Sequence, residues 1–297
     1  MADVTLTYKG STIAEMSDTG NKTLKTAGKY CEGDIGVSYV KPSSGGTSDD
    51  LAKKLITGEG DITEIPSDIT KIKDFAFYLS KNLKLTSLPS GITGIGNHTF
   101  YNCENLALTS LPSGLTSIGE LAFCGCKNLV LTSLPNGITN IDGGAFWDCN
   151  KIALTSLPSG IVWIKANTFN QCYSLALTSL PTGVTRIYDS AFRQCGNLAL
   201  TSLPDGVTII GDEAFYRCFN ITLTSIPSSV AIIGSYAFES CTGLTTITFK
   251  GTPTSIASNA FEGCTKITTI NVPWAEGAVS GAPWGATNAT IHYNTTT

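Results

Sequence analysis

The chain carries eight cysteines at a constant interval of 23 residues. The phenylalanine three residues before each of them keeps the same interval, as do prolines from Pro66 to Pro227. A fixed period of this length is typical of a solenoid, in which each repeat forms one coil that stacks on the next. The pattern therefore predicts a repeat solenoid of about nine coils. The eight cysteines are Cys103, Cys126, Cys149, Cys172, Cys195, Cys218, Cys241 and Cys264.

Spacing within one repeat separates the segments of a coil. Leu106, Leu108 and Leu111 are spaced as residues of a strand are, whereas Phe123 and Cys126 are spaced as on a helical turn. We therefore expect each coil to contain a strand, a turn at the Pro-Ser-Gly sequence, a second strand and a helical turn. Stacking would then produce two parallel strand ladders with a Phe/Cys/Leu core between them.

The cysteine ladder predicts free thiols rather than disulfides. Equivalent residues of stacked coils lie roughly 4.8 Å apart and point the same way. Eight such residues cannot pair without breaking the geometry that aligns them. We expect them to be buried and to act as small hydrophobic residues. Cys124 occupies an otherwise variable column, so we expect Cys124, together with Cys31, to carry the reactive thiols of the native protein.

Composition divides the chain into five segments. Alternating apolar residues between short turn sequences predict a small β module in residues 1–42, which we interpret as a docking segment. A Ser/Gly-rich flexible linker at 43–50 precedes a short cap helix at 51–57. The repeat solenoid covers 58–272, and residues 273–297 form a C-terminal cap.

Several classes of function are excluded by composition and motifs. The net charge is −4 and the basic residues do not cluster, so the main attraction for nucleic acid is missing. Neither a secretory signal nor an apolar run of about 18 residues is present, so membrane insertion is not expected. His98 and His292 have no metal-ligand partners at suitable spacing, and catalytic motifs are absent. We expect no enzyme activity, no cofactor and no metal.

The repeat resembles a known family. The unit Cys-x-x-Leu…Leu-Pro-x-x-Val/Ile-Thr-x-Ile-Gly-x-x-Ala-Phe-x-x-Cys is similar to the BspA-like class of leucine-rich repeats over residues 58–267. The resemblance implies a relation to bacterial surface adhesins and interaction proteins without catalytic residues. Residues 1–42 resemble an N-terminal segment of phage and prophage structural proteins, and the C-terminal cap is similar to caps from the same setting.

Outward columns of the repeat differ in how much they vary. The columns around Leu-x-Leu-Thr-Ser-Leu-Pro form a monotonous face of Ala, Thr and Ser. The columns beside the Thr-x-Ile strand and around the Phe/Cys positions instead carry aromatic residues, Arg and Asn, which are typical of binding surfaces. Neutral drift is the alternative explanation, but drift does not favour exposed aromatic residues such as Phe219. The predicted binding residues are Trp163, Tyr188, Arg186 and Lys165, with Trp147, Tyr173, Arg193 and Tyr216 along the neighbouring edge.

These observations favour a non-enzymatic recognition protein. The leading hypothesis is a phage or prophage tail-associated protein, made in the bacterial cytoplasm and carried on the virion. Residues 1–42 would dock to the particle or a partner subunit, and the solenoid would bind a bacterial surface protein or glycan. The alternatives are a bacterial cell-surface adhesin and a structural spacer without a ligand. Whether the chain forms a homo-oligomer stays open.

Overall fold

A computed structural model describes residues 4–8, 11–16, 22–24, 37–39, 60–65, 67, 69–72 and 74–295. The predicted linker at 43–50 and cap helix at 51–57 therefore lie outside the described residues, as does Cys31. Residue contacts divide the chain into two units, residues 1–149 and 150–297.

Four strands lie within the N-terminal 42 residues. Strands β1 (Val4–Tyr8), β2 (Ser11–Met16) and β3 (Lys22–Leu24) form an antiparallel sheet. Strand β4 (Val37–Tyr39) instead pairs antiparallel with β5 (Ile69–Ile72). Strand β4 thus covers the edge of the first repeat strand, where backbone groups would otherwise be unpaired.

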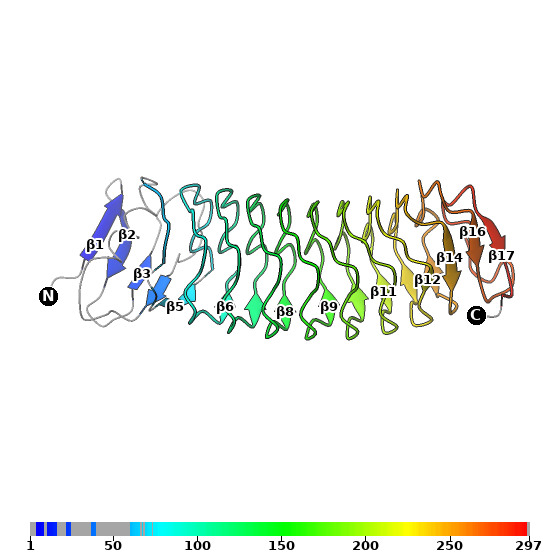
Figure 1. Cartoon of the computed structure of the whole chain (residues 1–297), viewed down its shortest axis with the longest axis horizontal. Helices are drawn as coiled ribbons and strands as arrows, with labels where there is room; N and C mark the ends of the chain where they lie inside the picture. The colour runs from blue at the N-terminus through cyan, green and yellow to red at the C-terminus, as the bar shows by residue number, and fades with distance from the viewer. Residues whose placement is uncertain are drawn as a thin grey trace. The chain divides into compact units, whose positions relative to one another are not determined.

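Parallel strands at the Thr-x-Ile positions repeat through both units. In the first unit, β5 is followed by β6 (Gly94–Ile95), β7 (Ser117–Ile118) and β8 (Asn140–Ile141). In the second unit the order is β9 (Trp163–Ile164), β10 (Arg186–Ile187), β11 (Ile209–Ile210), β13 (Ile232–Ile233) and β15 (Ser255–Ile256). Paired residues are 23 positions apart, and within each unit the strands stack along one edge of the coils (Figure 1). The predicted parallel solenoid with a 23-residue period is confirmed.

The expected second ladder of strands is found only near the C-terminus. It consists of β12 (Ser225–Ile226), β14 (Thr246–Phe249), β16 (Thr269–Asn271) and β17 (Thr290–His292). In earlier coils the Leu-x-Leu-Thr-Ser-Leu segment is not a strand, so the prediction was wrong there. A proline ends this segment and lacks the N–H that would continue the ladder. Lys250 replaces that proline one coil after Pro227, and its N–H donates to Ile226 O at 2.9 Å.

The segment around each phenylalanine is a series of tight turns rather than the expected helical turn. Ser190 and Gln194 flank Phe192 and have positive φ angles of 54° and 61°. The N–H groups of these three residues donate to carbonyls of the next coil, at 2.7, 2.7 and 2.9 Å for Ser190, Gln194 and Phe192. Left-handed residues are incompatible with a helix. They turn alternate N–H groups toward the neighbouring coil, so this segment forms a second hydrogen-bond ladder.

Phenylalanine and cysteine columns fill the core. In the second unit, the ring centroids of Phe169 and Phe192 lie 5.6 Å apart, and those of Phe192 and Phe215 lie 5.5 Å apart. The Sγ of Cys218 donates a hydrogen bond to Phe192 O at 3.0 Å, and other ladder cysteines repeat this contact. All nine cysteines in the described part of the chain are buried and form no disulfide, which confirms the predicted unbridged thiols of the ladder.

Cys124 differs from its expected environment. Its side chain is only 8% exposed, so the prediction of an accessible thiol was wrong. Burial and the nearby negative charge of Asp148 raise the pKa of Cys124 to about 12. A protonated, buried thiol is a poor nucleophile.

The C-terminal segment continues the repeat. Trp284 lies 23 residues after Phe261 and is fully buried, and its carbonyl accepts a hydrogen bond from Phe261 N–H at 2.8 Å. Trp274 packs edge-on against Trp284 with ring centroids 6.3 Å apart. Strand β17 pairs parallel with β16, so the larger indole rings close the core where the phenylalanine column ends.

Thiol accessibility tests the core assignment. We expect a Cys31→Ser variant to show no rapid reaction with a thiol reagent in the native state, because its remaining cysteines are buried. After denaturation all nine thiols should react. A native thiol that reacts rapidly and maps to Cys124 would contradict the described packing, and disulfides found by non-reducing peptide mapping would contradict the free ladder.

Stability should fall at alkaline pH. Burial raises the pKa of Cys103 and Cys264 to about 12 from the ordinary 9.0. Above pH 9.0 the unfolded chain loses thiol protons that the folded chain retains. The free energy of unfolding then decreases by about 1.4 kcal/mol per pH unit for each buried thiol. Denaturant titrations from about pH 8 to about pH 11 should show this decline.

A Cys218→Ala variant is the matched control for the alkaline effect. Burial raises the pKa of Cys218 well above its ordinary value. The free energy of unfolding of the variant should decrease less steeply with rising pH than that of the parent, and the difference in slope should be the contribution of one thiol. An identical pH dependence in both proteins would show that the thiols are not responsible.

Candidate recognition surface

Outward residues of the strand ladder form a continuous stripe in the second unit. Trp163, Arg186, Ile209 and Ile232 are consecutive cross-strand neighbours on β9, β10, β11 and β13, and we name them the strand stripe. Trp163 and Ile232 are 46% and 43% exposed. The following residue of each strand is a buried isoleucine. Alternation along the strand therefore anchors one face in the core and presents the other to solvent.

Two further predicted residues follow the strand stripe. Lys165 and Tyr188 occupy equivalent positions directly after β9 and β10, and both are half-buried. The Nη1 of Arg186 donates to Tyr188 Oη at 3.3 Å, which holds the guanidinium along this edge. The structure thus brings Trp163, Arg186, Lys165 and Tyr188 together on one edge of two adjacent coils.

Arg193 and Tyr216 belong to a separate cluster, in which the charged and aromatic side chains contact one another. Arg193 Nε lies 2.7 Å from Glu213 Oε2, and its guanidinium carbon lies 4.7 Å from the centre of the Tyr216 ring. The guanidinium of Arg217 also lies over this ring, at 5.2 Å. Burial, followed by the charge of Glu262, raises the pKa of Glu239 in the same column. These contacts stabilise the turn segment, so Arg193 and Tyr216 are less available to a partner than the strand stripe is.

Tyr173 lies on neither the strand stripe nor the Arg193 cluster, because it directly follows the cysteine of its coil. Gly196 and Phe219 hold the same position in the next two coils, and we name these three residues the aromatic notch. Tyr173 and Phe219 are 46% and 47% exposed. Column comparison identifies Phe219 as an exposed aromatic residue, although the predicted binding set omits it.

Trp147 lies in the first unit and is half-buried. Its N–H donates to Gly144 O at 3.0 Å, and its own carbonyl accepts from Gly125 N–H at 2.7 Å. The predicted binding residues are therefore distributed over several edges of the coil rather than over one surface.

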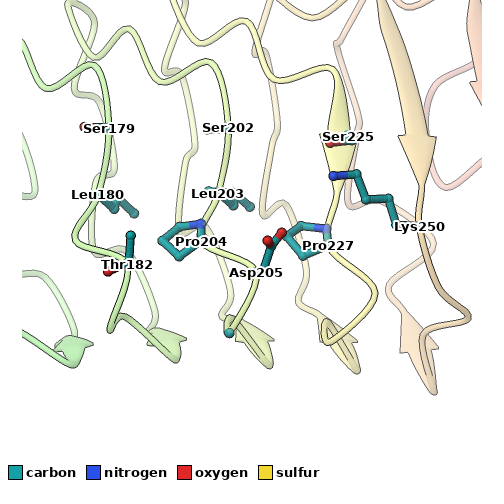
Figure 2. A pocket seen from close by; sticks show the side chains of 11 residues that line it. Ser179, Leu180, Thr182, Ser202, Leu203, Pro204, Asp205, Ser225, Pro227 and Lys250 are labelled. Atoms are coloured by element: carbon teal, nitrogen blue, oxygen red, sulfur yellow. The ribbon is translucent and has the colours of Figure 1, made fainter.

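A shallow groove of about 480 Å³ lies on the side predicted to be monotonous. Two leucines and two prolines form the apolar part of its lining, and the carboxylate of Asp205 lies between Pro204 and Pro227 (Figure 2). The Lys250 amine points toward Ser225 in the same view. Asp205 and Lys250 are charged residues in columns that are otherwise uncharged in the close repeats, so this face is less uniform than expected. The lining consists of Ser179, Leu180, Thr182, Ser202, Leu203, Pro204, Asp205, Gly206, Ser225, Pro227 and Lys250.

The described residues contain no group of three or more His, Cys, Asp or Glu side chains placed to hold a metal ion. Within the same part of the chain, no helix has the length and apolar character needed to cross a membrane.

The fold and its stacked Phe/Cys core define a leucine-rich-repeat solenoid. Comparison with known families finds the BspA type leucine-rich repeat region, matched over residues 61–176 and 162–277. The chain belongs to this family. No curated protein matches it.

Solved structures of leucine-rich-repeat proteins are similar to this chain. A leucine rich cell surface protein from Faecalibacterium prausnitzii A2-165 is 23% identical, with 97% of each chain covered and a TM-score of 0.55. The leucine rich repeat protein of T. pallidum is 29% identical, with coverage of 61% of this chain and 91% of that chain and a TM-score of 0.49. The first likeness shows a shared fold.

The arginine–tyrosine contact can be measured by a double-mutant cycle. We expect Arg193→Ala and Tyr216→Leu to be coupled in unfolding experiments by about 0.5–1 kcal/mol, because both remove the same cation–π contact. Arg193→Ala combined with Tyr173→Leu serves as the control and should be additive, since Tyr173 lies in another column. A coupling of zero between Arg193 and Tyr216 would contradict the described cluster.

Proposed function

We propose that this protein is a non-enzymatic recognition protein of the bacterial cell surface that binds a protein partner through the strand stripe. Membership in a leucine-rich-repeat family supports a binding role, because stacked repeats create long surfaces anchored by a constant core. The observation that carries the proposal is the row of outward residues on β9 to β13, of which Trp163 and Ile232 are nearly half exposed.

The chemistry of the stripe suits a protein partner. Trp and Arg are enriched among residues that dominate binding energy at protein interfaces. The strand stripe places a Trp, an Arg and two Ile side chains next to one another, and the tyrosine contact orients the arginine. The buried isoleucines of the same strands hold this row in place, so little ordering is required on binding.

The cell-surface location is supported by likeness to the cell surface protein from Faecalibacterium prausnitzii, which extends over nearly the whole chain. A phage or prophage tail-associated protein is the second candidate, and its support is the resemblance of residues 1–42 to phage structural proteins. Localisation distinguishes the two. Antibody labelling of intact producing cells would support the surface protein, whereas recovery of the chain in released particles would support the tail protein.

The binding role is tested with the fluorescently labelled full chain and a panel of intact bacterial cells. We expect a Trp163→Ala/Arg186→Ala variant to lose cell binding on the order of thirtyfold, since truncation of such anchors commonly costs about 2 kcal/mol or more. Its melting temperature should stay near that of the parent, because both side chains are exposed. Protease treatment of the target cells should also remove binding if the partner is a protein.

Two control variants locate the site. Thr155→Lys/Thr178→Lys changes exposed threonines of the monotonous face and should leave binding intact. Lys250→Gln changes the groove and should also have no effect. Binding that depends on Lys250 but not on Trp163 and Arg186 would place recognition in the groove, and binding unaffected by the stripe variant would overturn the proposed site.

A further inference from the structure

The aromatic notch is a regular feature on another edge of the second unit. Tyr173, Gly196 and Phe219 occupy one column in three consecutive coils. Beneath them, the core rings of the same coils stack at 5.6 and 5.5 Å. The backbones of Tyr173 and Phe219 are therefore roughly 10 Å apart. The coil between them has glycine, and so no side chain, at the same position. This column lies ten positions after the strand stripe along each coil.

Gly196 shapes the space between the two rings. A Cβ built on Gly196 would lie 3.8 Å from Phe219 Cδ2, so the phenylalanine ring extends toward the neighbouring coil. The ring is nevertheless 47% exposed. Phe219 thus lies near Gly196 while much of its side chain stays open to solvent, an arrangement that provides an exposed apolar surface.

Asparagine amides beside the notch are available for hydrogen bonding. The asparagine that follows this column donates Nδ2 to the preceding coil in two repeats of the first unit, as Asn105 does to Lys81 O at 2.7 Å and Asn128 does to Glu104 O at 2.9 Å. Asn197 and Asn220 hold the equivalent position in the second unit, and both are exposed. Each amide offers both a donor and an acceptor beside an aromatic ring.

We propose that the aromatic notch binds an extended β-1,4-linked oligosaccharide. Pyranose rings present C–H faces that pack on aromatic rings, and their hydroxyl groups pair with side-chain amides. In an extended β-1,4-linked chain, every second sugar presents the same face, at a repeat close to two coil spacings. Tyr173 and Phe219 would contact two such sugars, and the sugar between them would lie beside the edge of the Phe219 ring, over Gly196, which has no side chain. The notch residues carry no charge, which favours a neutral glycan.

The test uses the full chain with defined oligosaccharides in isothermal titration calorimetry. Cellohexaose and chitohexaose are the β-1,4-linked probes, and maltohexaose is the α-linked control. We expect binding of at least one β-1,4-linked probe and none of maltohexaose. A Tyr173→Ser/Phe219→Ser variant should bind at least tenfold more weakly, and Gly196→Gln should also weaken binding by filling the space between the rings.

Matched variants separate this site from the protein-binding stripe. The Trp163→Ala/Arg186→Ala variant should bind the oligosaccharide as the parent does, and circular dichroism should show that every variant keeps its fold. Failure of the parent to bind either β-1,4-linked probe in the millimolar range would overturn the proposal. Equal loss in the stripe variant, or no loss in the notch variant, would also overturn it. Neither result would affect the cell-binding experiment on the strand stripe.

Discussion

The contact between one coil and the next at the Phe/Cys column is the interaction on which each unit depends. Within each unit most coils contribute a buried phenylalanine that stacks on a neighbouring ring, and the cysteine-bearing coils add a thiol that donates to a carbonyl of the preceding coil. Backbone N–H groups beside the ring donate in the opposite direction, toward the next coil. Because each coil buries its apolar residues only against its neighbours, stability in such a fold is close to a sum of nearest-neighbour terms.

This dependence explains why cysteine suits its position. The side chain must be small enough to fit below a stacked ring and must satisfy a buried carbonyl. A thiol meets both conditions at low cost, because it is a weak donor and is readily buried. Its raised pKa follows from the same burial, so the residue that completes the core also limits the pH range in which the core is stable.

Periodicity alone predicts the solenoid, the inward columns and the free thiols, because each follows from an interval of 23 residues. It does not predict the conformation of individual segments. The apolar residues around Phe192 have the spacing of a helical turn, but Ser190 and Gln194 have left-handed backbone angles and the segment is not helical. Alternation in the Leu-x-Leu segment suggests a strand, but the proline that ends the segment prevents one in most coils. Column variation finds exposed aromatic residues such as Trp163 and Tyr173. It does not show which edge of the coil each of these residues lies on. It also does not reveal that Arg193 and Tyr216 already contact each other within the fold.

The separation of core and surface columns has a consequence for recognition. The strand stripe and the aromatic notch are supported by the same coils, but they share no side-chain partner and are ten residues apart along each coil. Changes at sites without shared contacts usually act independently. The exposed columns can therefore change residue by residue without disturbing the Phe/Cys contact beneath them. One set of coils would in this way carry the proposed protein-binding stripe and the proposed glycan-binding notch on different edges, each altered without loss of the other.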